Sequence, residues 1–316
     1  MLSIIKIPIE QILGAPENRY FGSGFRSFNI DLKNLELYTR EIKGQIKVNY
    51  NGPERPRGDE PHIGSIELIA FTSRISTYII NRICRVNIAD TDRAFITKYT
   101  LHIFRTMDEG THNFSCKLLS TTPYNNSLQG YISLLEIRFE NHALIKVEID
   151  HRGYLMYKTL PLDQFIPFDL EQLHTIGYKS TELNFSPLEI DIDAKTIQTE
   201  FTYTNHFEEN IFHGIGSARN SLLATDATRV FGQLMQALLY QLKNSDRIRC
   251  PNIWLRKMQL VQTRPTLKTN IKAHLLFENN REVFLNGKNW HLISLKGIVG
   301  SYTGYFEVAH KENKYE

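Results

Sequence analysis

The sequence is poor in cysteine and contains no long apolar run. Three cysteines, Cys84, Cys116 and Cys250, occur in 316 residues, and no two of them form a C-x-x-C pair. This spacing argues against zinc ribbons and dithiol redox motifs, and so few cysteines are typical of the reducing cytosol. No stretch approaches the roughly 18 uninterrupted apolar residues of a membrane-spanning helix, and the start, MLSIIKIPIEQILG, lacks the features of a signal peptide. We therefore expect a cytoplasmic protein that does not cross a membrane.

Positive and negative residues are nearly balanced in number, and the common catalytic motifs are missing. Lys and Arg number 37 against 34 Asp and Glu, and like charges do not form long runs. This balance argues against nucleic acid as a partner. The sequence has no HExxH pair, no close cluster of His and Asp, and no GxSxG elbow, so neither a metal site nor a serine hydrolase is supported. Its glycine-rich stretches do not lie within a βαβ unit, which argues against a dinucleotide site. We expect no cofactor.

Two long apolar segments predict the main helices. Residues 65–82 and 224–243 are apolar around most of their circumference, and such a helix is buried on all sides. Strand-like alternation dominates the rest of the chain, with roughly ten or more candidate strands. Two helices among so many strands disfavour a helical bundle or a βαβ architecture.

The two halves of the chain resemble each other in order and spacing. Residues 63–65 (Ile-Gly-Ser) match residues 215–217 at an offset of 152, and residues 35–37 match residues 188–190 at an offset of 153. The helices match at an offset of 159, so a seven-residue insertion precedes the second helix. The nearly constant offset favours a duplicated fold.

A buried helix enclosed by a strongly curved antiparallel sheet is the hot-dog arrangement. The expected fold class is therefore α+β, a double hot dog in which two curved antiparallel sheets each wrap a long central helix. We expect an N-terminal hot-dog domain at residues 1–160 and a C-terminal one at 188–316. Residues 161–187 are poorly periodic, contain three prolines and form the expected connection. A paired fold favours a site between the halves.

Carboxylates near the helix starts are the first candidates for chemistry. At these positions, Asp226 and Glu67 can simply interact with the helix macrodipole and cap free backbone amides. Alternatively, one of them is a general acid or base that substrate can reach. Gln233 and Arg74 follow seven residues later, nearly two helical turns on. They can contact substrate, or Gln233 can bond a neighbouring strand and Arg74 can form an ion pair with Glu67.

Histidines and arginines in loops add further candidates. His213 and His62 precede the two helices in the similar stretches His-Gly-Ile-Gly-Ser and His-Ile-Gly-Ser. A histidine that faces a carboxylate across the interface of two hot dogs can transfer protons near neutral pH, although a surface position is the alternative. Arg19 and Arg26 lie in a glycine-rich segment, LGAPENRYFGSGFR, where they can bind phosphate or carboxylate. The alternative is that they pack this segment against the body of the protein.

The segment LGAPENRYFGSGFR and the helix TDATRVFGQLMQALLYQL resemble the avirulence protein D (AvrD) family over nearly the whole chain. The second helix is also similar to that of hot-dog proteins such as A-factor synthase and acyl-carrier-protein dehydratases. The AvrD resemblance implies the biosynthesis of syringolide-like acyl glycosides. The substrates implied are a β-ketoacyl thioester of coenzyme A or acyl carrier protein and a sugar-like hydroxyl acceptor. The dehydratase motif His-x-x-x-Gly-x-x-x-x-Pro is not met at His62 or His213, which puts simple dehydration in doubt.

Three functions remain open from the sequence. The first is an acyl-transferring or condensing enzyme for a small acylated signal. The second is a hot-dog thioesterase or dehydratase, and the third is a non-enzymatic protein that binds an acyl ligand. The candidate catalytic residues are Asp226, Glu67 and His213, and the candidate substrate-binding residues are Gln233, Arg74, His62, Arg26 and Arg19. A fused double hot dog already contains the pair that single hot dogs form by dimerising, and a further homodimer is left open.

Overall fold

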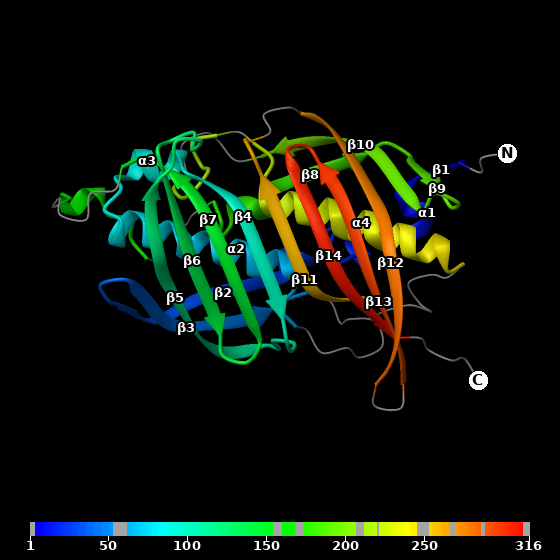
Figure 1. Cartoon of the computed structure of the whole chain (residues 1–316), viewed down its shortest axis with the longest axis horizontal. Helices are drawn as coiled ribbons and strands as arrows, with labels where there is room; N and C mark the ends of the chain where they lie inside the picture. Colours follow the sequence, from blue (N-terminus) through cyan, green and yellow to red (C-terminus); the bar gives the residue numbers. More distant parts are fainter. Residues whose placement is uncertain are drawn as a thin grey trace.

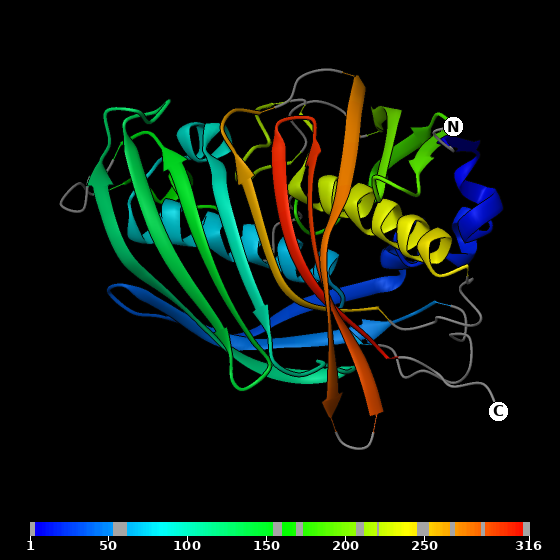
Figure 2. The same ribbon diagram turned by 45° about the vertical axis from the view of Figure 1, so that its right-hand side comes forward.

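A large antiparallel sheet with few helices makes up the structure (Figure 1). The computed structural model describes residues 4–52, 62–153, 160–168, 173–206, 212–219, 221–244, 253–265, 269–285 and 288–311. Within these residues the sheet has 14 strands. The two long helices lie on the same, concave side of it (Figure 2).

The elements of the first half of the chain recur in the second half. The first series is β2 (Phe28–Leu37), β3 (Glu41–Tyr50), α2 (Ser65–Tyr78), β4 (Phe95–Ile103), β5 (Gly110–Pro123), β6 (Tyr131–Phe139) and β7 (Ala143–His151). The second series is β9 (Leu188–Asp191), β10 (Thr196–Asn205), α4 (Ala224–Leu242), β11 (Ile253–Gln262), β12 (Asn270–Leu285), β13 (Lys288–Val299) and β14 (Tyr302–Lys311). The shorter elements are β1 (Ile4–Ile7), α1 (Ile9–Leu13), α3 (Ile88–Arg93) and β8 (Thr181–Phe185).

The order of strands in the sheet repeats as well. From the outer edge to the centre, the first half runs β2-β3-β5-β6-β7-β4 and the second runs β9-β10-β12-β13-β14-β11. Each of these twelve strands therefore has a counterpart at the same place in the other half, whereas β1, which lies outside β9 at the edge, and β8, which pairs with β10, have none among the described residues. At the centre β4 pairs with β11, with Tyr99 opposite Leu260. The sequence predicted two sheets, whereas the structure joins them into one, because this pairing satisfies the backbone groups of two strands that would otherwise be edges.

Side-chain alternation decides which face of each strand meets the core. In β6, Leu135, Ile137 and Phe139 are fully buried, while Glu136 and Arg138 between them reach solvent. This period of two is that of an antiparallel sheet with one buried face. The buried face carries the apolar side chains that pack against the two helices.

Both long helices lie where the sequence places them. Every residue of α2 is buried, and the chain continues from α2 into a π-helical turn at Ile79–Ile83. In α4, every residue from Ala224 to Tyr240 except Gln236 is buried. Among the described residues, no helix has both the length and the hydropathy needed to cross a membrane.

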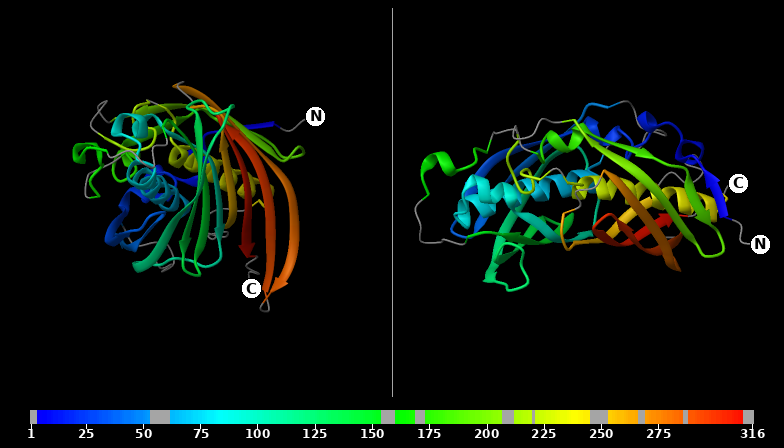
Figure 3. Two further views of the ribbon diagram at one scale, coloured as in Figure 1. Left: turned by 60° about the vertical axis from the view of Figure 1, so that its left-hand side comes forward. Right: turned by 90° about the horizontal axis from the view of Figure 1, so that it is seen from above.

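The N-terminal segment packs against the second half of the molecule. Strand β1 pairs with β9, with Ile7 opposite Leu188. Helix α1 follows, and its buried Ile9 and Leu13 belong to the same core cluster as α4. The first residues of the chain and α4 accordingly occupy the same end of the molecule (Figure 3). Residues 14–27 then lead back to the start of β2 in the first half.

Candidate functional site

The starts of α2 and α4 meet near the middle of the molecule. Ile66 and Ala70 of α2 and Leu223, which precedes α4, share one apolar cluster with Phe25 and Tyr178. From there the two helices extend away from each other (Figures 1 and 3). The N-terminal end of a helix carries about half a positive charge. The dipoles of both helices therefore favour negative charge near the middle of the molecule.

A fully buried carboxylate lies at each of these helix starts. Glu67 is the third residue of α2 and Asp226 the third residue of α4, and both are 0% exposed. Their equivalent places agree with the duplication inferred from the sequence. A carboxylate in the first turn is stabilised by the helix dipole, which offsets part of the cost of burying its charge.

Glu67 is held by the backbone and by the N-terminal segment. Its Oε2 accepts a hydrogen bond of 2.9 Å from the Gly64 amide and another from the Tyr20 hydroxyl. The first contact caps the helix, as in a capping box. Burial and the nearby Glu67 carboxylate both raise the pKa of Tyr20, so its hydroxyl remains a neutral donor. These contacts fit the capping role that the sequence left open for Glu67.

Asp226 is held by a hydroxyl and a guanidinium group. Its Oδ1 accepts from Thr181 Oγ1 at 2.6 Å and from Arg229 Nη1 at 2.9 Å. The two donors are themselves joined, because Arg229 Nη1 also donates to Thr181 Oγ1 at 2.8 Å. Asp226 Oδ2 is buried and has no described partner at normal hydrogen-bond geometry, although the Leu223 backbone and the Tyr203 hydroxyl also interact with this carboxyl group.

Burial governs the electrostatics of this pair. Desolvation raises the pKa of Asp226 above its usual value, although Arg229 and Thr181 act in the opposite direction. Desolvation likewise lowers the pKa of Arg229. The attraction between the two charges therefore does not fully offset the cost of removing them from water. A carboxyl group with a raised pKa is a stronger base when ionised and a usable acid when protonated.

Arg229 also fastens the N-terminal segment to α4. Its guanidinium group donates to the carbonyl oxygen of Gly22 at 3.3 Å and lies 4.4 Å from the centre of the Phe25 ring. A Cβ atom added to Gly232, one turn further along α4, would lie 2.5 Å from the Phe21 ring. The glycine-rich segment thus packs directly over the starts of both helices.

The two predicted arginines of this segment make contacts within the protein. Arg26 is exposed and donates to the carbonyl oxygen of Thr181 at 2.9 Å. Arg19 is 4% exposed and lies 3.7 Å from the Glu10 carboxylate. Both contacts fit the packing role that the sequence offered as the alternative to anion binding.

Gln233 and Arg74 are buried side chains with backbone partners. Gln233 Nε2 donates to the carbonyl oxygen of Arg229 at 3.4 Å. Arg74 is 9% exposed and donates to the carbonyl oxygens of Ile30 and Phe168, both at 3.2 Å. Arg74 thereby links α2 to β2 and to the segment that joins the two halves.

His213 faces a carboxylate from the other half of the chain. Its Nδ1 lies 2.8 Å from Asp92 Oδ2, and the amide of Gly214 donates to Asp92 Oδ1 at 2.8 Å. The next amide, of Ile215, donates to Thr77 Oγ1 near the end of α2. Thr77 lies ten residues beyond Glu67, or about 15 Å along the helix axis. The structure therefore separates His213 from the buried carboxylates.

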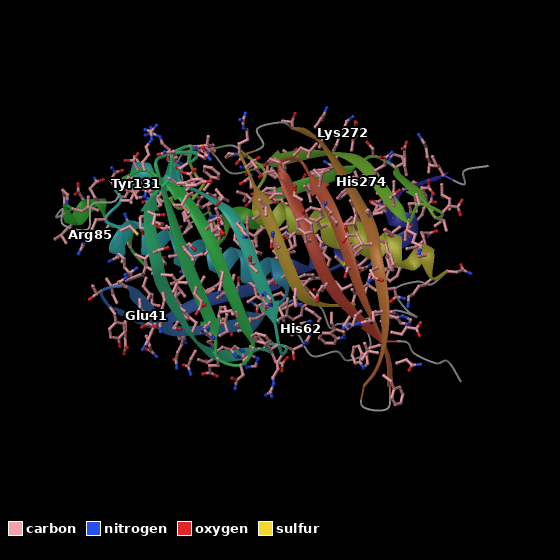
Figure 4. All side chains as sticks on the ribbon, in the orientation of Figure 1. Glu41, His62, Arg85, Tyr131, Lys272 and His274 are labelled. Carbon is pink, nitrogen blue, oxygen red and sulfur yellow. The ribbon has the colours of Figure 1, made fainter. Side chains whose placement is uncertain are left out.

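His62 lies beside the seam between the halves, close to the ends of β4 and β11 (Figure 4). Its ring stacks on Trp254 of β11, with the ring centres 5.3 Å apart. Its backbone forms an isolated bridge with Asp108. His62 and His213 thus precede equivalent helices but occupy different surroundings. No group of three or more His, Cys, Asp or Glu side chains in the described part of the chain could hold a metal ion.

The model of the Pseudomonas avirulence D protein (AvrD) family matches residues 7–312. The chain belongs to the AvrD family. A search of curated protein sequences found no match.

Several solved structures resemble this AvrD-family chain at low sequence identity. The acyl-CoA thioesterase II TesB2 of Mycobacterium marinum is 10% identical, with 90% of this chain and 96% of that one covered and a TM-score of 0.40. The dehydratase domain from the CurJ module of the curacin polyketide synthase is 10% identical, with 90% and 97% covered and a TM-score of 0.43. Rv0216 of Mycobacterium tuberculosis, described as a double hot dog, is 10% identical, with 80% and 83% covered and a TM-score of 0.41. Because these TM-scores are low, the description of the fold rests on the strand order of this chain.

Sequence reasoning missed the partners of the predicted residues. Arg229 could have been predicted as a partner of Asp226, because it lies three residues later and thus on the same side of α4. Tyr20, Thr181 and Asp92 had no such signal. They come from other segments, and the AvrD-family chain brings each of them to its partner only on folding.

Proposed function

We propose that this AvrD-family protein is an enzyme that acts on an acyl thioester, with Asp226 as its acid and base. In this proposal residues 1–160 and 188–316 form two hot-dog units, joined by residues 161–187, of which 169–172 lie outside the described residues. The substrates are a β-ketoacyl thioester of coenzyme A or acyl carrier protein and a sugar-like acceptor. The product is a syringolide-like acyl glycoside or its precursor.

One observation carries the proposal. The Asp226 carboxyl group is held at the start of α4 through Oδ1, and its pKa is raised, while Oδ2 makes no normal hydrogen bond. Oδ1 is firmly held, so Oδ2, whose contacts are weaker, is the oxygen to which we assign proton transfer. The family membership and the geometry both support an acyl-transfer reaction here.

The reaction follows from these groups. Asp226 Oδ2 takes the proton of the acceptor hydroxyl as its oxygen attacks the thioester carbonyl carbon. A carbon–oxygen bond forms, the carbon–sulfur bond breaks, and the departing thiolate receives the proton from Asp226. The products are an ester and a free thiol. The positive ends of the two helices favour the negative charge that develops on the carbonyl oxygen.

The covering segment must move for this reaction to occur. Asp226 is fully buried, and residues 19–26 pack over the start of α4 through Phe21, Gly22 and Phe25. A substrate can therefore reach Oδ2 only if part of this layer is displaced. The proposal accordingly includes an opening of the N-terminal segment on binding.

The test is a two-substrate assay with the purified protein. β-Ketoacyl-CoA thioesters are incubated with a panel of ketopentoses and small polyols, and thiol release and ester formation are followed by absorbance and mass spectrometry. We expect Asp226→Asn to reduce ester formation by about a hundredfold or more. Asp193→Asn, which changes an exposed carboxylate on a turn, serves as the matched control.

The outcomes separate the three functions. Ester formed by the wild type and lost in Asp226→Asn supports the proposal. Thiol released at the same rate without any acceptor indicates a thioesterase. Binding of a thioester without turnover indicates an acyl-binding protein. Unchanged ester formation by Asp226→Asn removes the catalytic role assigned to that residue.

A further inference from the structure

Two buried tyrosines from distant strands converge on the start of α4. Tyr203 lies on β10 and Tyr302 on β14, and these strands are separated in the sheet by β12 and β13. The Tyr203 hydroxyl lies 3.4 Å from the carbonyl oxygen of Ser221, and the Tyr302 hydroxyl lies 3.3 Å from that of Leu222. Ser221 and Leu222 immediately precede the α4 cap, so both hydroxyls lie beside the first turn of the helix.

Both hydroxyls lie within electrostatic reach of the Asp226 carboxyl group. The charge of Asp226 raises the pKa of Tyr203 and of Tyr302, and burial raises both further. Neither hydroxyl therefore ionises under ordinary assay conditions, and each remains a hydrogen-bond donor. Thr225, the neighbour of Asp226, has a buried hydroxyl that makes no hydrogen bond of normal geometry with a described residue. Hydroxyl donors and a carboxylate thus gather around one helix start.

The hydrogen bonds of Tyr203 and Tyr302 are long compared with those of other buried tyrosines. Hydroxyl donors usually lie about 2.7–2.8 Å from their acceptors. Tyr99 lies 2.8 Å from Ser73 Oγ, and the Tyr78 hydroxyl lies 2.9 Å from the carbonyl oxygen of Phe168. At 3.3 and 3.4 Å, Tyr302 and Tyr203 form much weaker bonds. Tyr203 also interacts with the Asp226 carboxyl group and Tyr302 with the Gln262 side chain, so a substrate carbonyl placed between the two hydroxyls replaces these contacts as well as the long ones to the backbone.

We propose that Tyr203 and Tyr302 hold the reacting carbonyl group of the acyl thioester beside Asp226. Their hydroxyls donate to the carbonyl oxygen, while Asp226 Oδ2 receives the proton of the attacking group. This inference rests on the proposed acyl-thioester function. It adds two catalytic residues and places the carbonyl between α4, β10 and β14.

The chemistry needs such donors at this place. When the acceptor oxygen adds to the carbonyl carbon, the carbonyl oxygen gains negative charge until the carbon–sulfur bond breaks. Neutral donors fixed in a dry site stabilise this charge more in the transition state than in the bound substrate. The two tyrosines come from rigid strands of the sheet, so their positions are set before substrate arrives.

The experiment measures binding of two uncleavable ligands to the full-length protein by calorimetry. The first is a pantetheine-based ketone in which a methylene group replaces the thioester sulfur. The second is the matching thioether, which lacks the carbonyl group. The variants are Tyr203→Phe and Tyr302→Phe, with Tyr78→Phe as the control because it removes a buried hydroxyl far from Asp226 along α2. Circular dichroism verifies that each variant is folded.

We expect each of the two site variants to bind the ketone about five- to tenfold more weakly, as expected for the loss of one hydrogen bond. The thioether should bind all four proteins equally, and Tyr78→Phe should match the wild type with both ligands. Equal ketone binding by the wild type and both site variants overturns the role of the tyrosines and leaves the proposed function standing. If the wild type binds neither ligand, the proposed function and this inference fail together.

Discussion

Removing Arg229 should destabilise the protein more than neutralising Asp226, although the two form one ion pair. In Asp226→Asn the guanidinium group keeps the Thr181 hydroxyl and the carbonyl oxygens of Thr181 and Gly22 as acceptors. In Arg229→Met, by contrast, the carboxylate stays buried without its cation and the N-terminal segment loses its link to α4. Breaking a buried pair in that way costs about 3–5 kcal/mol. We expect about 1.5–3 kcal/mol for Asp226→Asn, the value of one hydrogen bond to a charged group.

The dependence of stability on pH provides a second test of the Asp226–Arg229 pair. Arg229 lowers the pKa of Asp226, which burial has already raised above 3.8. Without Arg229 this pKa rises further, so the folded protein retains the proton to higher pH than the unfolded chain does. Stability from a raised carboxyl pKa is present at low pH and is lost as the pH rises through the folded value. Arg229→Met should therefore lose stability relative to the wild type between about pH 4 and neutral pH.

The assay is urea unfolding followed by circular dichroism at several pH values, with Arg229→Lys as the control. Lysine keeps the charge but not the fork of donors that reaches Thr181 and Gly22. We expect Arg229→Lys to recover the pH dependence of the wild type and only part of its stability. An Arg229→Met variant less destabilised than Asp226→Asn, or one whose deficit is independent of pH, would refute the argument.

Three further outcomes follow from packing and burial. Gly232→Ala should lower the free energy of unfolding by about 1–3 kcal/mol despite the higher helix propensity of alanine. Adding Phe21→Ala to the same chain should restore much of this loss, as thermal unfolding of the wild type, the single variant and the double variant can show. The Cys84 thiol, whose pKa burial raises to about 11, should react with a chromogenic disulfide at pH 8 only after denaturant is added, so prompt labelling would contradict its burial. Saturation with the uncleavable ketone should change amide hydrogen exchange in residues 19–26, and unaltered exchange there in a protein that binds the ketone would show that this segment does not open.

The local hydrophobic pattern of the sequence was sufficient to predict the two long helices and the equivalence of the two halves. Residues 65–82 and 224–243 are apolar around their circumference, and helices begin at Ser65 and Ala224. Glu67 and Asp226 could be identified because a carboxylate in the first turn is set by sequence spacing alone. Their burial could also be expected, since a helix without a polar face has no surface to offer water.

The partners of these residues could not be found in the same way. Tyr20 reaches Glu67 across 47 residues, Thr181 reaches Asp226 across 45, and Asp92 meets His213 across 121. No periodicity connects such positions. The convergence of β10 and β14 on the start of α4 likewise depends on the order of strands in the sheet.

The amino-acid sequence alone is enough to predict the two buried helices, the repeated series of elements and the carboxylate at each helix start. These features depend on hydrophobic period and on backbone groups within a few residues of each other. Tertiary packing joins the two sheets at β4 and β11 and pairs His213 with Asp92 far from the buried carboxylates. It also places Arg229 where it fastens the N-terminal segment over Asp226. These contacts form between segments far apart in the chain, where the packing of the whole fold selects the partner.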